Sequence, residues 1–124
     1  MNLMRRILVV DDNKLVRSML QDILVHAGYE ATSAEGVEPA LVLVKDWKPD
    51  LIITDYYMEG LHGDSFVKMI RDSPPHIASL PIIGLAGTAE SEKKLRDAGV
   101  DEYIAKPFMK KALLKSVAAY FQEK

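Results

Sequence analysis

Four side chains in this sequence are well suited to chemistry, because each follows a short apolar run: Asp11, Asp12, Asp55 and Lys106. Carboxylates brought together repel one another unless a cation joins them, and their oxygens suit Mg²⁺ or Mn²⁺. A lysine beside them would add positive charge to a bound phosphate, so the set could support phosphoryl transfer. The central carboxylate, Asp55, is best placed as the nucleophile that forms an aspartyl phosphate, and Asp12 would hold the metal.

The segments that must position these residues alternate between apolar runs and stretches with helical spacing. The runs predicted as strands are residues 7–10, 30–33, 51–54, 81–85 and 103–105. The predicted helices are residues 13–27, 37–46, 64–72, 89–98 and 110–122, with Pro74 and Pro75 closing the third. In the first helix, two neighbouring rows predict a wide apolar stripe: Leu15, Met19 and Ile23, then Val16, Leu20 and Leu24.

The strand pattern predicts the fold class. The runs are apolar rather than alternating, which indicates strands buried on both faces. Strands separated by helices pair in parallel through right-handed crossovers. We therefore expect one doubly wound α/β domain over residues 1–124, with its ligand site at the carboxyl ends of the strands. There the loops that carry Asp12, Asp55 and Lys106 would converge.

Composition excludes several other classes of protein. The chain has 124 residues, a hydrophobic fraction of 48% and a net charge of −2. Without a long run of lysine or arginine, direct nucleic-acid binding is poorly supported. No apolar stretch approaches the roughly 20 residues of a membrane helix. No cysteine is present, which rules out disulfides and suits a cytoplasmic domain.

Four motifs, in this order and at these separations, resemble those of the response-regulator receiver domain, the phosphoryl-accepting module of two-component signalling. They are residues 7–13 (ILVVDDN), 49–58 (PDLIITDYYM), 81–85 (PIIGL) and 98–108 (AGVDEYIAKPF). The resemblance covers essentially the whole chain. It implies a flavodoxin-like (βα)5 three-layer sandwich with a parallel sheet of order 2-1-3-4-5.

The resemblance also implies roles for individual residues. Asp55 would be the phosphorylation site, and Asp11 and Asp12 the acidic pair that binds Mg²⁺ (or Mn²⁺). The backbone carbonyl of Tyr57 would be a further metal ligand. Lys106 would contact the phosphoryl group.

Three further expectations come from the resemblance. The peptide bond before Pro107 would be cis, and Tyr103 would hold the aromatic position that moves inward on activation. The phosphoryl donor would be a sensor histidine kinase or a histidine phosphotransfer protein, and a downstream protein would read the switch. The chain would be a signalling receiver rather than an enzyme, catalysing only its own phosphorylation and dephosphorylation. It could be a stand-alone regulator or a receiver cut from a longer protein.

The sequence departs from the family pattern in two places. The family has Thr or Ser where Ala86 ends the fourth strand. Either Ala86 is the true match, or the loop bulges and offers Thr88 instead. We favour the first reading, with Thr88 as a helix N-cap. In the loop after the third strand, Glu59 replaces a proline and His62 an aspartate, while Gly63 is retained.

Simpler structural interpretations stand beside these roles. Asp11 could bind the metal through water or cap the first helix. Tyr103 could pack at a sheet edge, and Tyr56 and Tyr57 could be half-exposed aromatics. The charged residues of 90–97 fit a solvated helix face. The three histidines lack metal-like spacing and suit surface or helix-end positions: His26, His62 and His76.

Competing functions make different predictions. A phosphorylation-independent, receiver-like binding module is favoured by Ala86 and Glu59. A phosphatase with an aspartyl intermediate would need a second aspartate at the position of Tyr57. A flavin mononucleotide carrier would place its phosphate against Asp11 and Asp12, which would repel it.

Overall fold

The structure, a computed structural model, describes residues 4–122, so the predicted domain of 1–124 extends beyond them at both ends. Its strands are β1 (Arg6–Val10), β2 (Glu30–Ala34), β3 (Leu51–Asp55), β4 (Ile82–Ala86) and β5 (Glu102–Ala105). Its helices are α1 (Lys14–His26), α2 (Val37–Asp46), α3 (Gly63–Arg71), α4 (Pro75–Ala78), α5 (Ala89–Ala98) and α6 (Lys110–Tyr120). Apart from α4, each element lies within two residues of its prediction.

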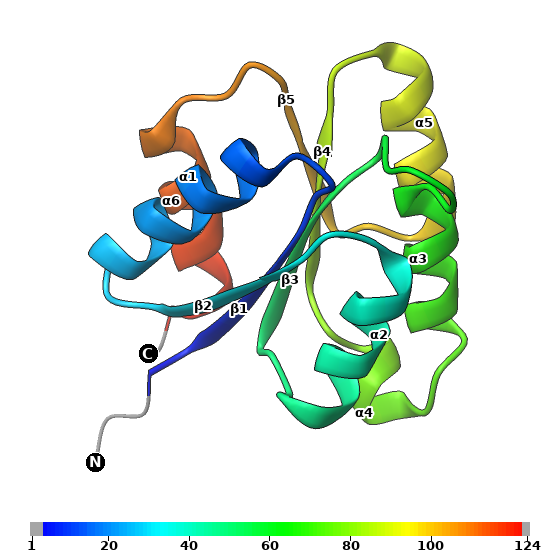
Figure 1. Cartoon of the computed structure of the whole chain (residues 1–124), viewed down its shortest axis with the longest axis horizontal. Coiled ribbons are helices and arrows are strands. Elements are labelled where there is room, and N and C mark those ends of the chain that lie inside the picture. The colour runs from blue at the N-terminus through cyan, green and yellow to red at the C-terminus, as the bar shows by residue number, and fades with distance from the viewer. Residues whose placement is uncertain (1–3, 123–124) are drawn as a thin grey trace.

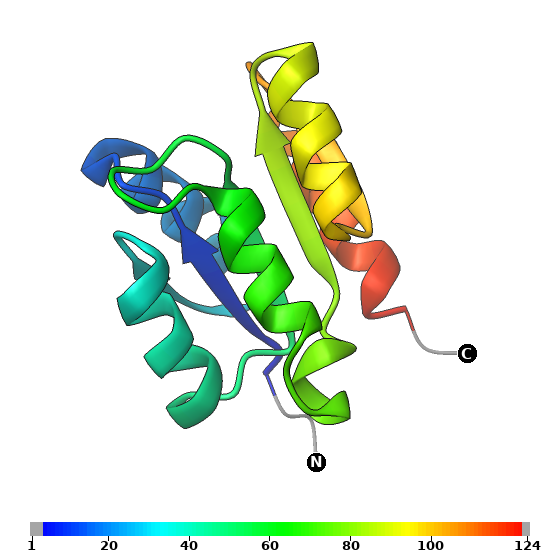
Figure 2. The ribbon, with the colours of Figure 1, turned by 90° about the vertical axis from the view of Figure 1, so that its right-hand side faces the viewer.

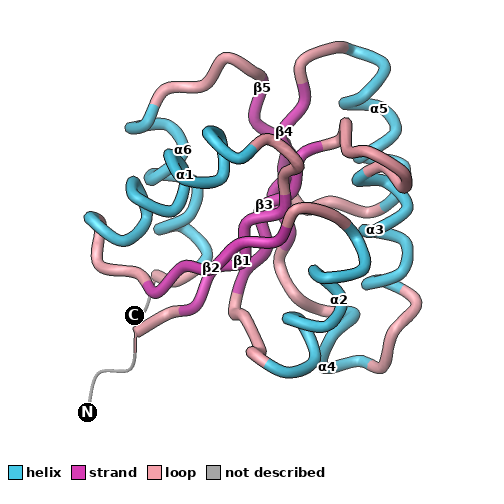
Figure 3. The backbone as a smooth tube through the Cα atoms, viewed as in Figure 1, coloured by secondary structure: helices cyan, strands magenta, loops and turns pink. Residues whose placement is uncertain are grey.

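The five strands form one parallel sheet of order β2-β1-β3-β4-β5. Helices α1 and α6 cover one face, and α2, α3 and α5 cover the other, so the domain has three layers (Figures 1 and 3). Each face of the sheet has its own apolar core against these helices. The predicted doubly wound fold and its strand order are confirmed.

Burial differs between the central strands and the edges of the sheet. All residues of β3 and β4, and the last four of β1, are buried, as the apolar runs predict. The edge strands β2 and β5 are mostly half-buried, so the prediction of burial on both faces is wrong for them. A strand at an edge has one side without a neighbouring strand, which explains the weaker apolar signal in these two segments.

The apolar stripe of α1 is narrower than predicted. Leu20 and Leu24 are fully buried against the sheet, whereas Leu15 is 81% and Met19 46% exposed. Of the first row only Ile23 packs against this core, where it is half-buried, so the stripe loses Leu15 and Met19. Asn13 caps its start by accepting a hydrogen bond from the Val16 amide at 3.1 Å.

The short helix α4 is not predicted by helical periodicity, because it follows Pro74 directly and spans only one turn. Its connection is held by Arg71, whose Nη1 donates to the carbonyls of Ala78 and Leu80 at 2.7 Å. The same guanidinium bonds the Gly99 carbonyl at 2.9 Å and the Asp101 carboxylate at 2.8 Å. Figure 2 shows α4 beyond the amino ends of the strands.

Within residues 4–122, no helix combines the length and apolarity needed to cross a membrane.

Candidate functional site

The centre of the candidate site is Asp55, the last residue of β3, with a relative exposure of 8%. Its Oδ1 accepts a hydrogen bond from the Tyr56 amide at 2.9 Å, and its Oδ2 lies 3.0 Å from Lys106 Nζ. Lys106 follows β5, and its backbone amide donates to the Ala86 carbonyl at 2.8 Å. The parallel sheet therefore brings Asp55 and Lys106 together across β4, as expected from their positions after strands.

Asp11 is the second carboxylate of this centre and is almost completely buried. Its Oδ1 accepts a hydrogen bond from the Asn13 amide at 2.9 Å, and its Oδ2 lies 3.9 Å from Lys106 Nζ. In residues 4–122, Asp11 Oδ2 is the one buried side-chain nitrogen or oxygen that lacks a hydrogen bond. Burial, with the nearby charge of Asp55 adding to it, raises the pKa of Asp11 from 3.8 to about 6.

Asp12 is exposed and has a different partner. Its Oδ2 accepts a hydrogen bond from the Glu59 amide at 2.9 Å, which ties the loop after β1 to the loop after β3. On the other side of this acidic loop, Arg17 Nη1 donates to the Asp11 carbonyl at 2.9 Å. The ion pairs of Lys106 thus involve Asp55 and Asp11, whereas we expected Asp12 to share the centre with Asp55 and Lys106.

The loop after β3 packs closely against the backbone of Asp55. The Gly63 amide donates to the Tyr56 carbonyl at 2.8 Å. A Cβ at position 63 would collide with the backbone carbonyl oxygen of Asp55. The retained glycine is therefore required by close backbone approach. Its neighbour His62, the N-cap residue of α3, lies with its ring 5.1 Å from that of Tyr56.

Neither Ala86, at the position where the family has Thr or Ser, nor Thr88 offers a free hydroxyl to the site. Ala86 ends β4, is buried and carries no polar side-chain atom. Thr88 forms a capping box at the start of α5: its Oγ1 accepts a hydrogen bond from the Ser91 amide at 3.0 Å. The N-cap interpretation of Thr88 is confirmed, because its hydroxyl is engaged with the helix.

Tyr103 is half-buried in β5 and packs against the edge of the core that faces α5. The Arg96 guanidinium lies 4.6 Å from its ring centroid. A hydrogen bond with Glu92 raises the pKa of Tyr103 above its usual value. The ring is thus held between two residues of α5.

The remaining predictions for this region concern Tyr57, Pro107 and the charged helix. The Tyr57 side chain is 50% exposed, with its ring edge against Tyr56 at 4.8 Å between centroids. The Lys106–Pro107 peptide bond is cis, as the resemblance implied. The charged face of α5 is solvated and carries i,i+4 ion pairs, such as Lys93–Asp97 at 2.8 Å.

The donor set fits a hard divalent cation. In residues 4–122, no three His, Cys, Asp or Glu side chains gather closely enough to hold a metal by themselves. However, Mg²⁺ usually takes only one or two carboxylates and completes its shell with water and phosphate oxygens. The buried Oδ2 of Asp11, which lies beside Asp55 and accepts no hydrogen bond, provides this kind of ligand.

Comparison with known proteins identifies the family. The family model of the response regulator receiver domain matches residues 7–118, so the chain belongs to this family. Receiver domains are signalling modules of two-component systems rather than enzymes, they typically bind Mg²⁺, and their partners are histidine kinases. The resemblance stated from the motifs is confirmed.

Three relatives illustrate the similarity. The phosphate regulon transcriptional regulatory protein PhoB of Pseudomonas aeruginosa is 33% identical over 117 residues, which cover 93% of this chain and 51% of PhoB. The chain therefore spans about half the length of this relative. The chemotaxis protein CheY of Halobacterium salinarum is 32% identical over 117 residues, covering 92% of this chain and 94% of that protein. The structure of chemotaxis response regulator CheY4 of Vibrio cholerae superposes with a TM-score of 0.87 at 30% identity, covering 95% and 99% of the two chains.

Two polar residues near the site were missed from the sequence. Arg17 lies in the second turn of α1 and could have been noticed from its spacing of six residues from Asp11. Lys94, on α5, places its Nζ 5.9 Å from the ring centroid of Tyr56. No sequence signal relates residues 56 and 94, because only the packing of α5 on the sheet brings them together.

Proposed function

We propose that this receiver domain accepts one phosphoryl group on Asp55 from a phosphohistidine donor and thereby changes its binding to a downstream protein. The observation that carries the proposal is the 3.0 Å contact between Lys106 Nζ and Asp55 Oδ2, next to the Oδ2 of Asp11, which accepts no hydrogen bond. This arrangement brings together a nucleophile, a positive charge and an oxygen atom that can bind a metal ion. The cytoplasmic location that we expect from the sequence belongs to the same proposal.

In the proposed reaction, a carboxylate oxygen of Asp55 attacks phosphorus. The new P–O bond forms as the P–N bond of the donor breaks, and the electron pair returns to the imidazole nitrogen. Lys106 would exchange its contact with the Asp55 carboxylate for one with a phosphoryl oxygen, which carries the negative charge after transfer. Asp11, Asp12, Asp55 and the Tyr57 carbonyl would hold Mg²⁺, which supplies further neutralisation of phosphoryl charge.

Two exposed apolar residues border the site and suit contact with the donor protein. Leu15 lies in the first turn of α1, directly after the acidic loop, and Met109 follows the Lys106–Pro107 segment. Their relative exposures are 81% and 75%. We expect Leu15→Asp to slow transfer from a histidine phosphotransfer protein but not from acetyl phosphate. Val25→Asp, at the far end of the same helix, is the matched control.

Intact-protein mass spectrometry tests the central proposal. Wild-type protein mixed with Mg²⁺ and acetyl phosphate should gain the mass of one phosphoryl group, and removal of Mg²⁺ should prevent this. Asp55→Asn should remain unlabelled, whereas Asp46→Asn, an exposed aspartate on α2, should label like the wild type. The proposal is wrong if the wild type stays unlabelled with both acetyl phosphate and phosphohistidine donors, or if Asp55→Asn is labelled equally.

A second candidate function is a binding module of the same fold that acts without phosphorylation. It is favoured by one observation, the buried Ala86 in place of a hydroxyl, together with the engagement of Thr88 in its helix cap. This function predicts that Asp55→Asn leaves partner affinity and signalling output unchanged. Loss of output in that variant, with the fold intact, would exclude it.

A further inference from the structure

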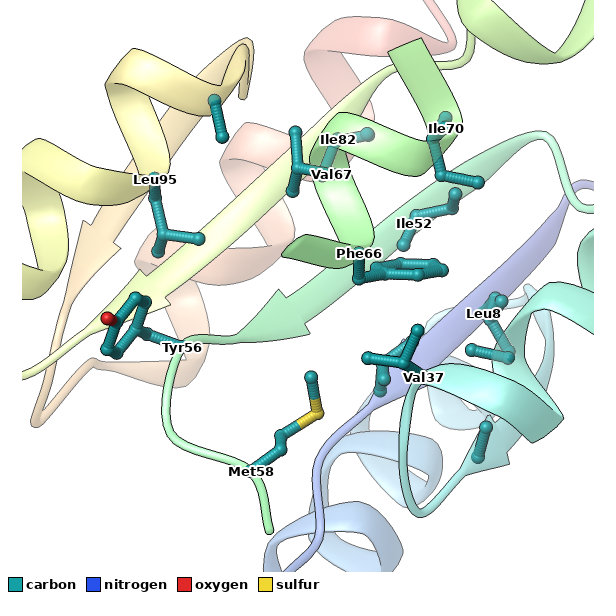
Figure 4. Packing of buried hydrophobic residues seen from close by; sticks show 14 of the residues in the cluster. Leu8, Val37, Ile52, Tyr56, Met58, Phe66, Val67, Ile70, Ile82 and Leu95 are labelled. Carbon is teal, nitrogen blue, oxygen red and sulfur yellow. The ribbon is translucent and has the colours of Figure 1, made fainter. Parts of the chain in front are cut away.

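Tyr56 links the candidate site to the core, because it follows Asp55 in the chain and its side chain is buried. It directly follows Asp55, and its amide donates to Asp55 Oδ1 at 2.9 Å. Its side chain is only 3% exposed and belongs to the cluster that includes Ala86 and Leu95. Figure 4 shows its ring on the side of this cluster where Leu95 descends from α5. A change at the Asp55 carboxylate therefore acts first on a residue that is packed toward α5.

The side chain of Tyr56 also meets a charge on α5. Lys94 Nζ lies 5.9 Å from the ring centroid, within range of a cation–π interaction. A hydrogen bond with the Tyr56 hydroxyl raises the pKa of Lys94, and Glu90, at 3.8 Å, adds to the effect. Lys94 therefore lies beside the ring of a buried tyrosine next to the candidate phosphorylation site.

Other side chains between Asp55 and α5 are poorly suited to carry a signal. Ala86 has no polar atom to sense a phosphoryl group, and the hydroxyl of Thr88 is engaged with Ser91. The contacts of Tyr103 are with two residues of α5 itself, Arg96 and Glu92. Tyr56 and Lys94 form the contact that runs from the carboxylate to the helix.

We propose that Tyr56 and Lys94 transmit the phosphorylation state of Asp55 to helix α5. The proposal rests on the phosphorylation of Asp55 proposed above. Phosphorylation converts the monoanionic carboxylate into an acyl phosphate, whose phosphoryl group carries more negative charge. This alters the hydrogen bond from the Tyr56 amide. The Tyr56 ring moves with its backbone. The Lys94 ammonium group then moves with the ring and toward the added negative charge on Asp55. The exposed, charged face of α5 then presents the change to a partner.

Amide chemical shifts and hydrogen exchange of α5 (Ala89–Ala98) test this link, with and without Mg²⁺ and acetyl phosphate. Tyr56→Phe removes the hydroxyl and keeps the ring, and Lys94→Met removes the charge and keeps most of the stem. Lys93→Met is the matched control, because Lys93 pairs with Asp97 on the solvated face.

All variants should reach the same phosphoryl stoichiometry as the wild type by mass spectrometry. We expect the response of α5 to fall by roughly twofold or more in Tyr56→Phe and in Lys94→Met. Because both residues act in one contact, the response of the double variant should be no smaller than the smaller of the two single-variant responses. Lys93→Met should respond like the wild type. If Tyr56→Phe fails to fold, Lys94→Met decides the result by itself.

Two results overturn the inference while leaving the proposed function intact. One is a wild-type α5 that does not respond although Asp55 is labelled. The other is an undiminished response of α5 in labelled Lys94→Met. If the wild type takes up no phosphoryl group at all, the proposed function and this inference fail together.

Discussion

Replacing Asp11 with asparagine should stabilise the protein near neutral pH in the absence of Mg²⁺. The carboxylate is buried, one of its oxygens lacks a hydrogen bond, and its pKa is raised from 3.8 to about 6. A raised pKa means that the native state binds the proton more tightly than the unfolded chain does. The associated stability is complete below about pH 3.8 and is lost as the pH rises through about 6. Asparagine has the same shape and carries no charge, so it avoids this loss.

The size of the effect follows from the shift in pKa. The change from 3.8 to about 6 corresponds to roughly 3 kcal/mol, at about 1.4 kcal/mol for each pH unit. This value is an upper limit, because the amide nitrogen of asparagine also needs a hydrogen-bond partner at this buried position. We expect Asp11→Asn to gain about 2 kcal/mol relative to the wild type between pH 4 and pH 8. With an m-value of about 1 to 3 kcal/mol per molar urea, the urea midpoint should rise by roughly 1 M.

Urea denaturation at pH 4 and pH 8, in buffer free of divalent cations, measures this difference. Asp46→Asn, at an exposed position of α2, is the control and should follow the wild type at both pH values. Adding Mg²⁺ at pH 8 should raise the stability of the wild type by about 2.7 kcal/mol at 100 times its dissociation constant. The Asp11→Asn variant should gain much less, because it lacks a proposed metal ligand.

A different outcome would refute this reasoning. If Asp11→Asn is less stable than the wild type at pH 8 without Mg²⁺, the buried charge is compensated by interactions that the structure does not contain. If the variant differs from the wild type by the same amount at pH 4 and pH 8, Asp11 does not titrate in this range.

Three further substitutions test how the site and its surroundings are held in place, each by urea denaturation. Gly63→Ala should cost about 1 to 3 kcal/mol, or prevent folding, because its Cβ meets the carbonyl of Asp55; an unchanged midpoint would contradict the required close approach. Arg71→Ala should cost about 3 kcal/mol or more, because four hydrogen bonds of a charged group are lost. Arg96→Ala loses only an exposed i,i+4 pair and a cation–π contact with Tyr103, so it should cost about 1 kcal/mol. Equal costs for the two arginines would argue against Arg71 as a structural clamp. Thr88→Ala should cost about 1 kcal/mol and Thr88→Ser close to nothing, because only the hydroxyl caps α5. A similar loss of stability in both variants would contradict the capping role.

The sequence predicted where the chemistry would lie because of a general property of parallel sheets. Side chains that directly follow strands meet at one edge, so the positions of Asp55 and Lys106 after apolar runs were enough to bring them together. The same reasoning placed Asp11 and Asp12 nearby but assigned the central role to Asp12. Burial selected Asp11 for the centre, while a backbone amide on another loop holds Asp12.

Local sequence patterns also could not predict which apolar residues of a helix are buried. Helical spacing located α1, but it could not tell that Leu15 and Met19 remain exposed, because this depends on how the helix lies on the sheet. In contrast, the cap at Thr88 follows from local hydrogen bonding, and its residue type alone indicated it.

By itself, the sequence predicted the parallel sheet and the nucleophile candidate, because these depend on apolar periodicity and on which residue ends each strand. The family followed from the resemblance of its four motifs. Only the tertiary structure decided which oxygen of the acidic pair accepts no hydrogen bond, why Gly63 must lack a side chain, and that Lys94 meets Tyr56. These features arise between segments that are distant along the chain. Their contacts depend on side-chain burial and on the packing of α3 and α5 against the sheet, which no spacing along one segment encodes.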